Sequence, residues 1–247
     1  MDAKERASSQ VVLITGASHG IGFEVCRQLA RHGMTVIITA RNLAKAEVAA
    51  QQLVGEGLDV RPHALDVTQD ESTRHLAAVL EQEFGRVDVL VNNAAAYVDW
   101  SEKATTADLK AAHAVFETNM FGAWRTSQAL LPLIHKSKHG RIVNVSSGAG
   151  SHSDQQFGLT TNRGSVASYG ISKAALNALT VKLAAELEGS GILVNAVCPG
   201  LTATAPGMEA MGAHPVEEGA ASVVWAATLP DDGPTGGFFR HGKPLPW

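Results

Sequence analysis

The sequence predicts an α/β fold: a doubly wound parallel sheet of about seven strands, covered by helices on both faces. Short apolar runs alternate with helical patterns along the chain. The apolar runs are nearly continuous, as expected for strands that are buried on both faces. No repeat, low-complexity tract or linker divides the 247 residues. We therefore expect a single domain over residues 1–247, with a flexible start at residues 1–9.

The apolar runs are the predicted strands. Each is short and bounded by Gly, Pro or polar residues, and most are rich in Val, Ile or Leu, which is typical of buried strands. Pro199 and Gly200 end the sixth run, because proline has no backbone N–H to donate. The predicted strands span residues 11–15, 35–39, 58–65, 87–91, 141–145, 192–198 and 237–240.

The intervening segments carry helix start and stop signals. Asn42 can cap a helix that glycines end after residue 54, and Thr68 with Glu71 forms a capping box. Pro215 and the acids that follow it suit the first turn of the last helix. Residues 148–165 form a long polar loop, which favours a functional role. The predicted helices span about residues 20–32, 42–54, 68–84, 106–134, 166–188, and a segment that begins at 214.

Composition argues against several classes of partner. Net charge is −4 and no basic patch is present, so nucleic acid and anionic membranes are not expected partners. The apolar run at residues 11–14 is too short for a signal peptide or membrane span, so we expect a soluble cytoplasmic protein. Cys26 and Cys198 suit reduced, buried thiols better than a disulfide. The histidines show no zinc-like spacing, so no metal site is expected.

A glycine-rich turn joins the first strand to the first helix. It reads Thr15-Gly16-Ala17-Ser18-His19-Gly20-Ile21-Gly22. A phosphate that approaches backbone N–H groups at a helix N-terminus would be obstructed by a Cβ, which glycine lacks. Because this turn lies in the first βαβ unit, it predicts a dinucleotide site, with a plain glycine turn as the alternative.

Tyr169 and Lys173 lie four residues apart, which places them on one face of a helix. A nearby positive charge favours the ionised phenol and lowers its pKa from the usual ~10. Such a tyrosine can transfer a proton near neutral pH. Ordinary surface packing is the alternative, and the pair alone does not decide between them.

Combined with Asn92-Asn93-Ala94 and a serine after the fifth strand, these motifs resemble the short-chain dehydrogenase/reductase family over about residues 10–247. Thr39-Ala40-Arg41-Asn42 and the ending at 233–239 are most similar to its carbonyl-reductase-like branch. The resemblance implies a Rossmann-type domain. It implies Asn119, Ser147, Tyr169 and Lys173 as the catalytic set. Ser147 precedes Gly150 by three positions, as in the family, and Ser146 is the alternative.

The resemblance also implies a division of roles. Ser147 and Tyr169 would bind the substrate carbonyl oxygen, and Tyr169 would donate a proton while NADPH gives a hydride. Lys173 would lower the tyrosine pKa and bind the nicotinamide ribose. Asn119 would hold a water that links Lys173 to solvent, with a purely structural asparagine as the alternative.

The end of the second strand predicts the cofactor. An acid there binds the ribose 2′-hydroxyl of NAD, whereas an arginine accommodates the 2′-phosphate of NADP. Arg41 stands there with Asn42 beside it, so we expect NADP(H), unless Arg41 is only a solvated loop residue. Ala95 replaces the family's usual glycine. The other cofactor contacts implied by the resemblance are Gly16, Ser18, His19, Gly20, Ile21, Gly22, Asp66, Val67, Asn93, Ala94, Ala95, Tyr169, Lys173, Pro199, Gly200, Thr202 and Thr204.

The expected function is therefore NADPH-dependent reduction of a hydrophobic ketone or aldehyde. An NAD-dependent alcohol or hydroxysteroid dehydrogenase and a non-catalytic dinucleotide-binding sensor are the alternatives. The loop before Tyr169 is of intermediate length for the family, so a homo-oligomer is favoured without being decided. A largely apolar set of side chains is expected to line the substrate site: Tyr97, Val98, Trp100, Phe157, Leu159, Met208 and Met211.

Overall fold

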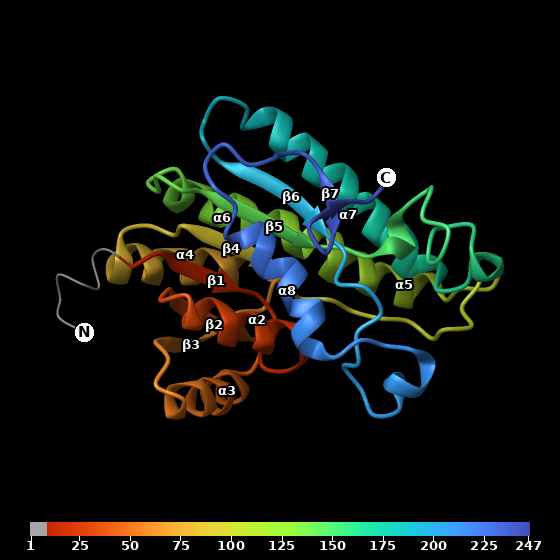
Figure 1. Ribbon diagram of the computed structural model, residues 1–247, viewed down its shortest axis with the longest axis horizontal. Helices are drawn as coiled ribbons and strands as arrows, with labels where there is room; N and C mark the ends of the chain where they lie inside the picture. Colours follow the sequence, from red (N-terminus) through yellow and green to blue (C-terminus); the bar gives the residue numbers. More distant parts are fainter. Residues whose placement is uncertain (1–8) are drawn as a thin grey trace.

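The computed structural model describes residues 9–247, so the predicted flexible start at residues 1–9 lies, except for residue 9, outside the described part of the chain. Within residues 9–247, a central eight-stranded sheet has the order β3-β2-β1-β4-β5-β6-β7-β8 (Figure 1). All pairings are parallel except that of β7 with β8. The strands are β1 (Val11–Ile14), β2 (Thr35–Ala40), β3 (Val60–Ala64), β4 (Val89–Asn92), β5 (Arg141–Val145), β6 (Leu193–Val197), β7 (Phe238–Arg240) and β8 (Lys243–Pro244).

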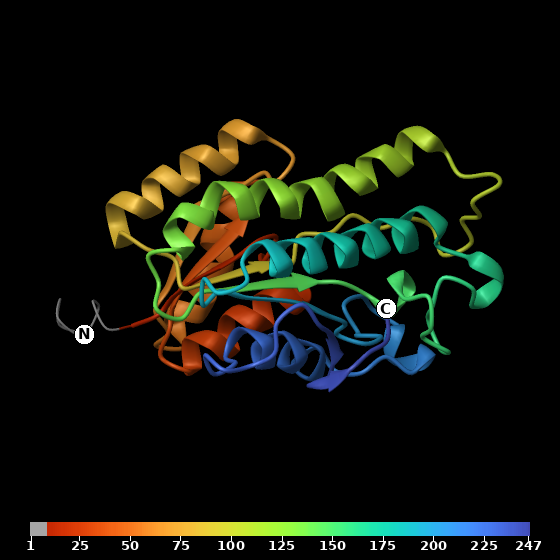
Figure 2. The ribbon, with the colours of Figure 1, turned by 90° about the horizontal axis from the view of Figure 1, so that it is seen from above.

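Helices cover both faces of this sheet, which confirms the predicted fold class (Figure 2). One apolar core packs α2, α3 and α8 against the sheet, and a second packs α4, α6 and α7 against its other face. The α-helices are α2 (Gly20–Arg31), α3 (Leu43–Gly55), α4 (Asp70–Phe84), α5 (Leu109–Phe116), α6 (Ala123–Ile134), α7 (Ala167–Glu186) and α8 (Val216–Ala227). The π-helix η1 (Glu117–Gly122) lies between α5 and α6, and the short 3-10 turns are η2 (Gly148–Gly150), η3 (Asn162–Gly164) and η4 (Met208–Met211).

Strand side chains alternate between the two cores. In β1, Val12 and Ile14 face the core with α2 and α8, whereas Val11 and Leu13 face the other core. Successive side chains of a strand point to opposite faces, so both sets are buried only because helices cover both sides. Burying each such side chain stabilises the fold by roughly 1.5–3 kcal/mol, which accounts for the uninterrupted apolar runs.

Two helix predictions are wrong in detail. The helix predicted over residues 106–134 begins at Leu109, capped by Asp108, and is interrupted by the π-helical turn Glu117–Gly122. Gly122 packs so closely on Val67 that a Cβ there would lie 2.7 Å from the Val67 Cγ2. The predicted capping box is absent, because α4 begins at Asp70 and the Thr68 hydroxyl instead donates to the Asp66 carboxylate at 2.7 Å.

Other local predictions are confirmed. The Asn42 side chain accepts from the backbone N–H of Ala44 at 2.9 Å and so caps α3. Cys26 and Cys198 are both buried and free. Pro215 is the N-cap residue of α8, so the helix begins two residues later than predicted and Pro215 lies just before its first turn. The eighth strand was not predicted, because two residues carry no periodic signal. No helix within residues 9–247 is both long and apolar enough to cross a membrane.

The strand order places the candidate site. β1 lies between β2 and β4, so the chain winds outward in both directions from this point. In such sheets, ligands bind at the carboxyl ends of the strands beside this switch point. The glycine turn follows β1, Asn93 follows β4, and Ser146 follows β5, so three predicted site segments meet at this edge.

Candidate active site

A cavity of about 890 Å³ opens at the carboxyl edge of the sheet. Of the predicted cofactor residues, the structure brings these to its wall: Gly16, Ser18, His19, Gly20, Ile21, Gly22, Arg41, Asn42, Asp66, Val67, Asn93, Ala94, Ala95, Tyr169, Lys173, Pro199 and Thr204. Gly200 and Thr202 are not part of that lining. Thr202 is buried and donates its hydroxyl hydrogen to the Pro199 carbonyl at 3.2 Å. The Thr202 side chain therefore forms a hydrogen bond within the loop after β6 and does not face the cavity.

The glycine turn is built against the segment that follows β4. The Asn93 amide donates to the carbonyls of Thr15 and Gly16 at 2.9 and 3.0 Å. Gly16 has φ +62°, and a Cβ there would lie 2.8 Å from the Ala94 Cα. A Cβ on Gly22 would lie 2.4 Å from the Asn93 amide nitrogen. The turn thus forms a cradle that only glycine fits, which suits a phosphate-bearing dinucleotide.

Two basic side chains line the cavity between the carboxyl end of β2 and the first turn of α3. Arg41 and Lys45 are both exposed, and both line the cavity together with His19. Sequence reasoning missed Lys45, although its position four residues after Arg41 was a usable signal. Ala95 is not among the residues with positive φ, so its backbone conformation is one that alanine adopts without strain.

Lys173 is buried beneath the tyrosine ring. Its Nζ donates to the Val145 carbonyl at 2.8 Å and lies 5.6 Å from the centroid of the Tyr169 ring. Burial lowers the pKa of Lys173 to about 8. Because a buried ammonium is disfavoured, the lysine is poised to gain or lose charge slightly above neutral pH.

The Tyr169 phenol differs from the sequence-based expectation. Removal of its hydroxyl from water raises the pKa of Tyr169, the neighbouring Tyr97 adds to this, and a hydrogen bond with Ser147 opposes it. Lys173 is not among the causes of this shift, and its ammonium donates to the Val145 carbonyl. The expectation that Lys173 lowers this pKa is therefore wrong. The phenol holds its proton at neutral pH.

The two candidate serines have different partners. The Ser147 side chain accepts from the Ala149 N–H at 3.2 Å, and its hydroxyl acts to lower the pKa of Tyr169. Ser146 lines the cavity, but its hydroxyl donates to the Asn177 carboxamide at 2.6 Å. Ser147 does not line the cavity, but of the two serines it is the one that acts on the Tyr169 phenol, which favours it over Ser146.

Asn119 lies in the π-helical turn and is 1% exposed. Its carboxamide accepts from the Ala96 N–H at 2.7 Å and donates to the Ala96 carbonyl at 3.0 Å. It also donates to the Ser172 hydroxyl at 3.0 Å. These contacts join the segment after β4 to α7. The water-binding role implied for Asn119 stays a prediction.

The chain has two tyrosines, and they stack on each other. The ring centroids of Tyr97 and Tyr169 are 5.3 Å apart with an interplanar angle of 21°. Tyr97 is nevertheless 71% exposed, so its outer face is open. Of the predicted substrate-lining side chains, Tyr97 lines the cavity, whereas Phe157 lies under the guanidinium of Arg240 at 5.4 Å.

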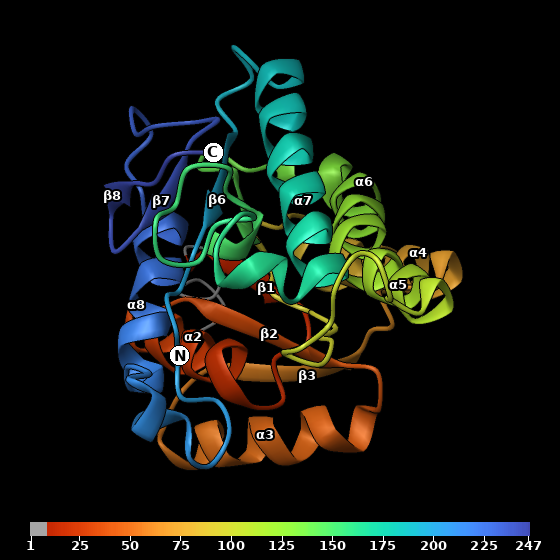
Figure 3. The same ribbon diagram turned by 90° about the vertical axis from the view of Figure 1, so that its right-hand side faces the viewer.

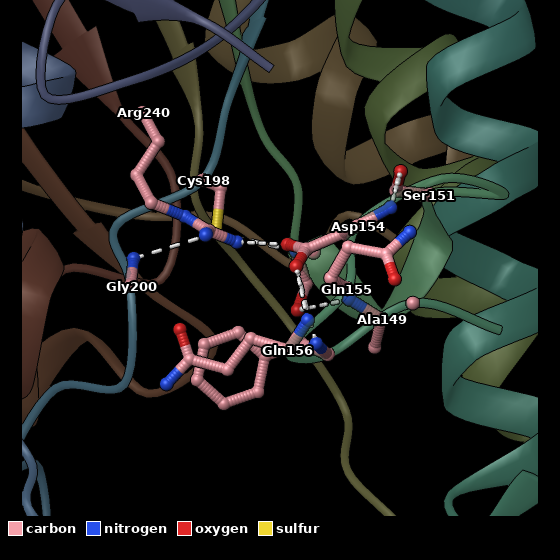
Figure 4. Close-up of polar contacts among 12 residues, drawn as sticks. Ala149, Ser151, Asp154, Gln155, Gln156, Cys198, Gly200 and Arg240 are labelled. Carbon is pink, nitrogen blue, oxygen red and sulfur yellow. Dashed lines mark hydrogen bonds and ion pairs between the residues drawn. The ribbon is translucent and has the colours of Figure 1, made fainter. Parts of the chain in front are cut away.

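Figure 4 shows a polar network around Arg240, whose members do not line the cavity. Arg240, at the end of β7, pairs with Asp154 and donates its Nε–H to the Cys198 sulfur at 3.4 Å. That sulfur also accepts from the N–H groups of Gly148 and Gly200, at 3.2 and 3.4 Å. The network joins the loops that follow β5, β6 and β7.

Asp154 anchors the long loop before α7. Burial raises its pKa, but the Gln156 N–H at 2.8 Å and the Arg240 guanidinium outweigh burial and hold the pKa of Asp154 below its ordinary value. The Ser151 hydroxyl accepts from the Asp154 N–H and donates to the Pro246 carbonyl. The loop before α7 is therefore hydrogen-bonded to the C-terminal segment at Pro246.

Replacing Arg240 by Met is expected to lower the free energy of unfolding by about 2–4 kcal/mol, because Asp154 would stay buried without its cation. Urea denaturation measures the change. Adding Asp154→Asn to that variant should recover part of the loss, since the unpaired charge is then removed. A double variant less stable than Arg240→Met alone would contradict this assignment.

Comparisons with known proteins find similarity to dehydrogenases and reductases. A sequence profile of a family described as short chain dehydrogenase matches residues 10–213. "Short-chain dehydrogenase/reductase 1" of Saponaria officinalis is 32% identical, over 98% of this chain and 97% of the relative. "Carbonyl reductase [NADPH] 1" of Sus scrofa is 34% identical, over 98% and 95%. The crystal structure of NADPH-bound carbonyl reductase from chicken fatty liver superposes with a TM-score of 0.84 at 27% identity, over 97% and 99% of the two chains.

Proposed function

This chain belongs to the short-chain dehydrogenase/reductase family, in its carbonyl-reductase-like branch, and from that premise we propose that it reduces hydrophobic ketones or aldehydes with NADPH. One observation carries the proposal. Tyr169 and Lys173 stand in the wall of the same cavity as the glycine cradle. A proton donor and a dinucleotide site thus share one enclosed space, which is the arrangement that carbonyl reduction requires.

NADP(H) is proposed as the cofactor. Arg41 and Lys45 would bind the 2′-phosphate, since the guanidinium is a planar donor fork and the ammonium a mobile cation. Of the charged residues that line the cavity, Asp66 is the one acid, and it follows β3 rather than β2, where an acid would bind the NAD ribose. The pig and chicken relatives carry NADPH in their names, which is consistent with this choice.

The protein's own groups would act as follows. Ser147 and Tyr169 donate hydrogen bonds to the substrate carbonyl oxygen, and Tyr169 transfers its proton as negative charge develops there. Because its pKa is raised, Tyr169 keeps this proton until the oxygen becomes a strong base. Lys173, in its charged form, would bind the nicotinamide ribose, as the family resemblance implies. When bound, NADPH supplies the hydride.

Hydrophobic carbonyl compounds are proposed as the substrates, because the open face of Tyr97 offers an apolar surface beside the proton donor. A panel of aldehydes and ketones, assayed by loss of NADPH absorbance, tests the proposal. We expect turnover with apolar members and with NADPH above NADH. Binding of NADPH without consumption by any carbonyl would instead favour a dinucleotide sensor.

The pH dependence follows from Lys173. Its pKa is lowered to about 8, so the charged form is present below that pH and is lost above it. We expect kcat/KM for NADPH to fall by up to about tenfold per pH unit above 8, because this parameter reports ionisations of the free enzyme. In Lys173→Arg the cation persists, and the residual activity should lack this decline. A parent profile that stays flat to pH 10 would contradict the assignment.

A further inference from the structure

The helix that carries Tyr169 and Lys173 has no cap of its own. Val166 precedes α7 with φ 49° and ψ 43°, and its side chain makes no capping hydrogen bond. This left-handed conformation is rare for a β-branched residue and costs on the order of 1–3 kcal/mol. The first N–H groups of a helix need partners, so something else must satisfy them.

Glu102 supplies that partner from a distant part of the chain. Its carboxylate accepts from the Ser168 N–H at 2.8 Å and from the Ser168 hydroxyl at 2.9 Å. Figures 2 and 3 show the loop between β4 and α5, which contains Glu102, beside the start of α7. A carboxylate at this end also interacts favourably with the positive pole of the helix.

The same loop holds the turn that leads into α7. Lys103 donates to the carbonyls of Asn162 and Arg163 at 3.2 and 3.1 Å. Both of these residues have positive φ, at 49° and 54°. Tyr97, earlier in the loop, stacks on the Tyr169 ring. Residues 97–103 therefore contact the proton donor's ring, its helix and the preceding turn.

Ser168 directly precedes Tyr169 in the chain. A hydrogen bond that fixes the Ser168 N–H therefore also fixes the orientation of the backbone to which the Tyr169 side chain is attached. We propose that Glu102 is a positioning residue for proton transfer, which orients Tyr169 by capping α7 from the loop after β4. This inference rests on the proposed function, because it assigns Glu102 a part in the same reaction. Glu102 itself is not among the residues that line the cavity.

The test combines Glu102→Ala with Tyr169→Phe. A misplacement of about 1 Å can cost 10²-fold, so Glu102→Ala is expected to lower kcat by about 10–100-fold with NADPH affinity retained. Introduced into Tyr169→Phe, the same change should cost almost nothing further, since the group that it orients is gone. Losses that multiply in the double variant would show that Glu102 acts elsewhere and would overturn the proposal.

Two variants separate orientation from loss of charge. Glu102→Gln keeps an acceptor oxygen for the Ser168 N–H and should retain kcat within about threefold, as a positioning hydrogen bond predicts. Glu71→Ala removes a carboxylate from the first turn of α4 and should leave kcat unchanged. If Glu102→Gln lost as much as Glu102→Ala, the effect would be that of charge and the proposal would fail.

A second readout needs no turnover. With two tyrosines in the chain, ¹³C-labelled tyrosine gives two sets of ring signals. Glu102→Ala should shift or broaden the Tyr169 set, whereas Glu71→Ala should not. Unchanged ring signals in a folded Glu102→Ala protein would overturn the inference even if no carbonyl substrate were found. Shifted signals without parent activity would refute the proposed function alone.

Discussion

Tyr169→Phe is expected to lower kcat for carbonyl reduction by about 10³-fold, the middle of the range that a positioned general acid contributes. The variant keeps the ring that stacks on Tyr97 and loses only the hydroxyl that would donate the proton. NADPH affinity should therefore change little, because the glycine cradle and Arg41 are untouched. The fold should also persist, since the packing of α7 is preserved.

Steady-state kinetics and NADPH fluorescence titration separate the two quantities. Tyr97→Phe is the matched comparison, because it removes the other phenol of the chain. It should lower kcat by less than about tenfold, since Tyr97 transfers no proton in the proposed reaction. If Tyr169→Phe turned over at close to the parent rate, Tyr169 would not be the acid.

The second large effect concerns cofactor choice. Arg41→Asp is expected to shift the ratio of kcat/KM for NADPH over NADH by about 10²–10³-fold towards NADH, because a favourable charge-assisted contact is replaced by repulsion. The carboxylate can also accept from the ribose 2′-hydroxyl of NADH. Lys45→Ala should shift the ratio in the same direction by a smaller factor, since it removes a cation without adding an anion.

Kinetics with both cofactors, repeated at low and high salt, measure this preference. Surface charge pairs are screened by salt, so the parent preference for NADPH should weaken as ionic strength rises. Arg74→Asp gives the same change of charge on an exposed face of α4, away from the cavity lining, and should leave the ratio unchanged. Equal shifts in the Arg41 and Arg74 variants would mean that net charge, not contact, is responsible.

Several parts of the site were predictable because their signals are local. The Gly16, Gly20 and Gly22 pattern follows from what a phosphate requires of the backbone. Arg41 could be assigned to the end of the second strand once that strand was predicted, because it directly follows the apolar run. Burial on both faces makes β1, β2 and β4 largely apolar, so they could be predicted from short apolar runs, whereas β3 contains Arg61 and His63 and is only partly buried. The capping box predicted at Thr68 does not form, because the Thr68 hydroxyl donates to the carboxylate of Asp66, two residues earlier in the chain.

Local patterns in the sequence were enough to predict the order of strands and helices, the glycine turn and the Tyr169–Lys173 pair, because each depends on residues close together in the chain. The tertiary structure alone decided that Glu102 caps α7, that Tyr97 stacks on Tyr169, and that Arg240 joins Asp154 to Cys198. It also reversed the expected shift in the Tyr169 pKa, because burial of the phenol raises that pKa, while the Lys173 ammonium donates to the Val145 carbonyl. Hydrogen bonds and desolvation act across space, and short patterns along the chain do not encode which distant groups the fold brings together.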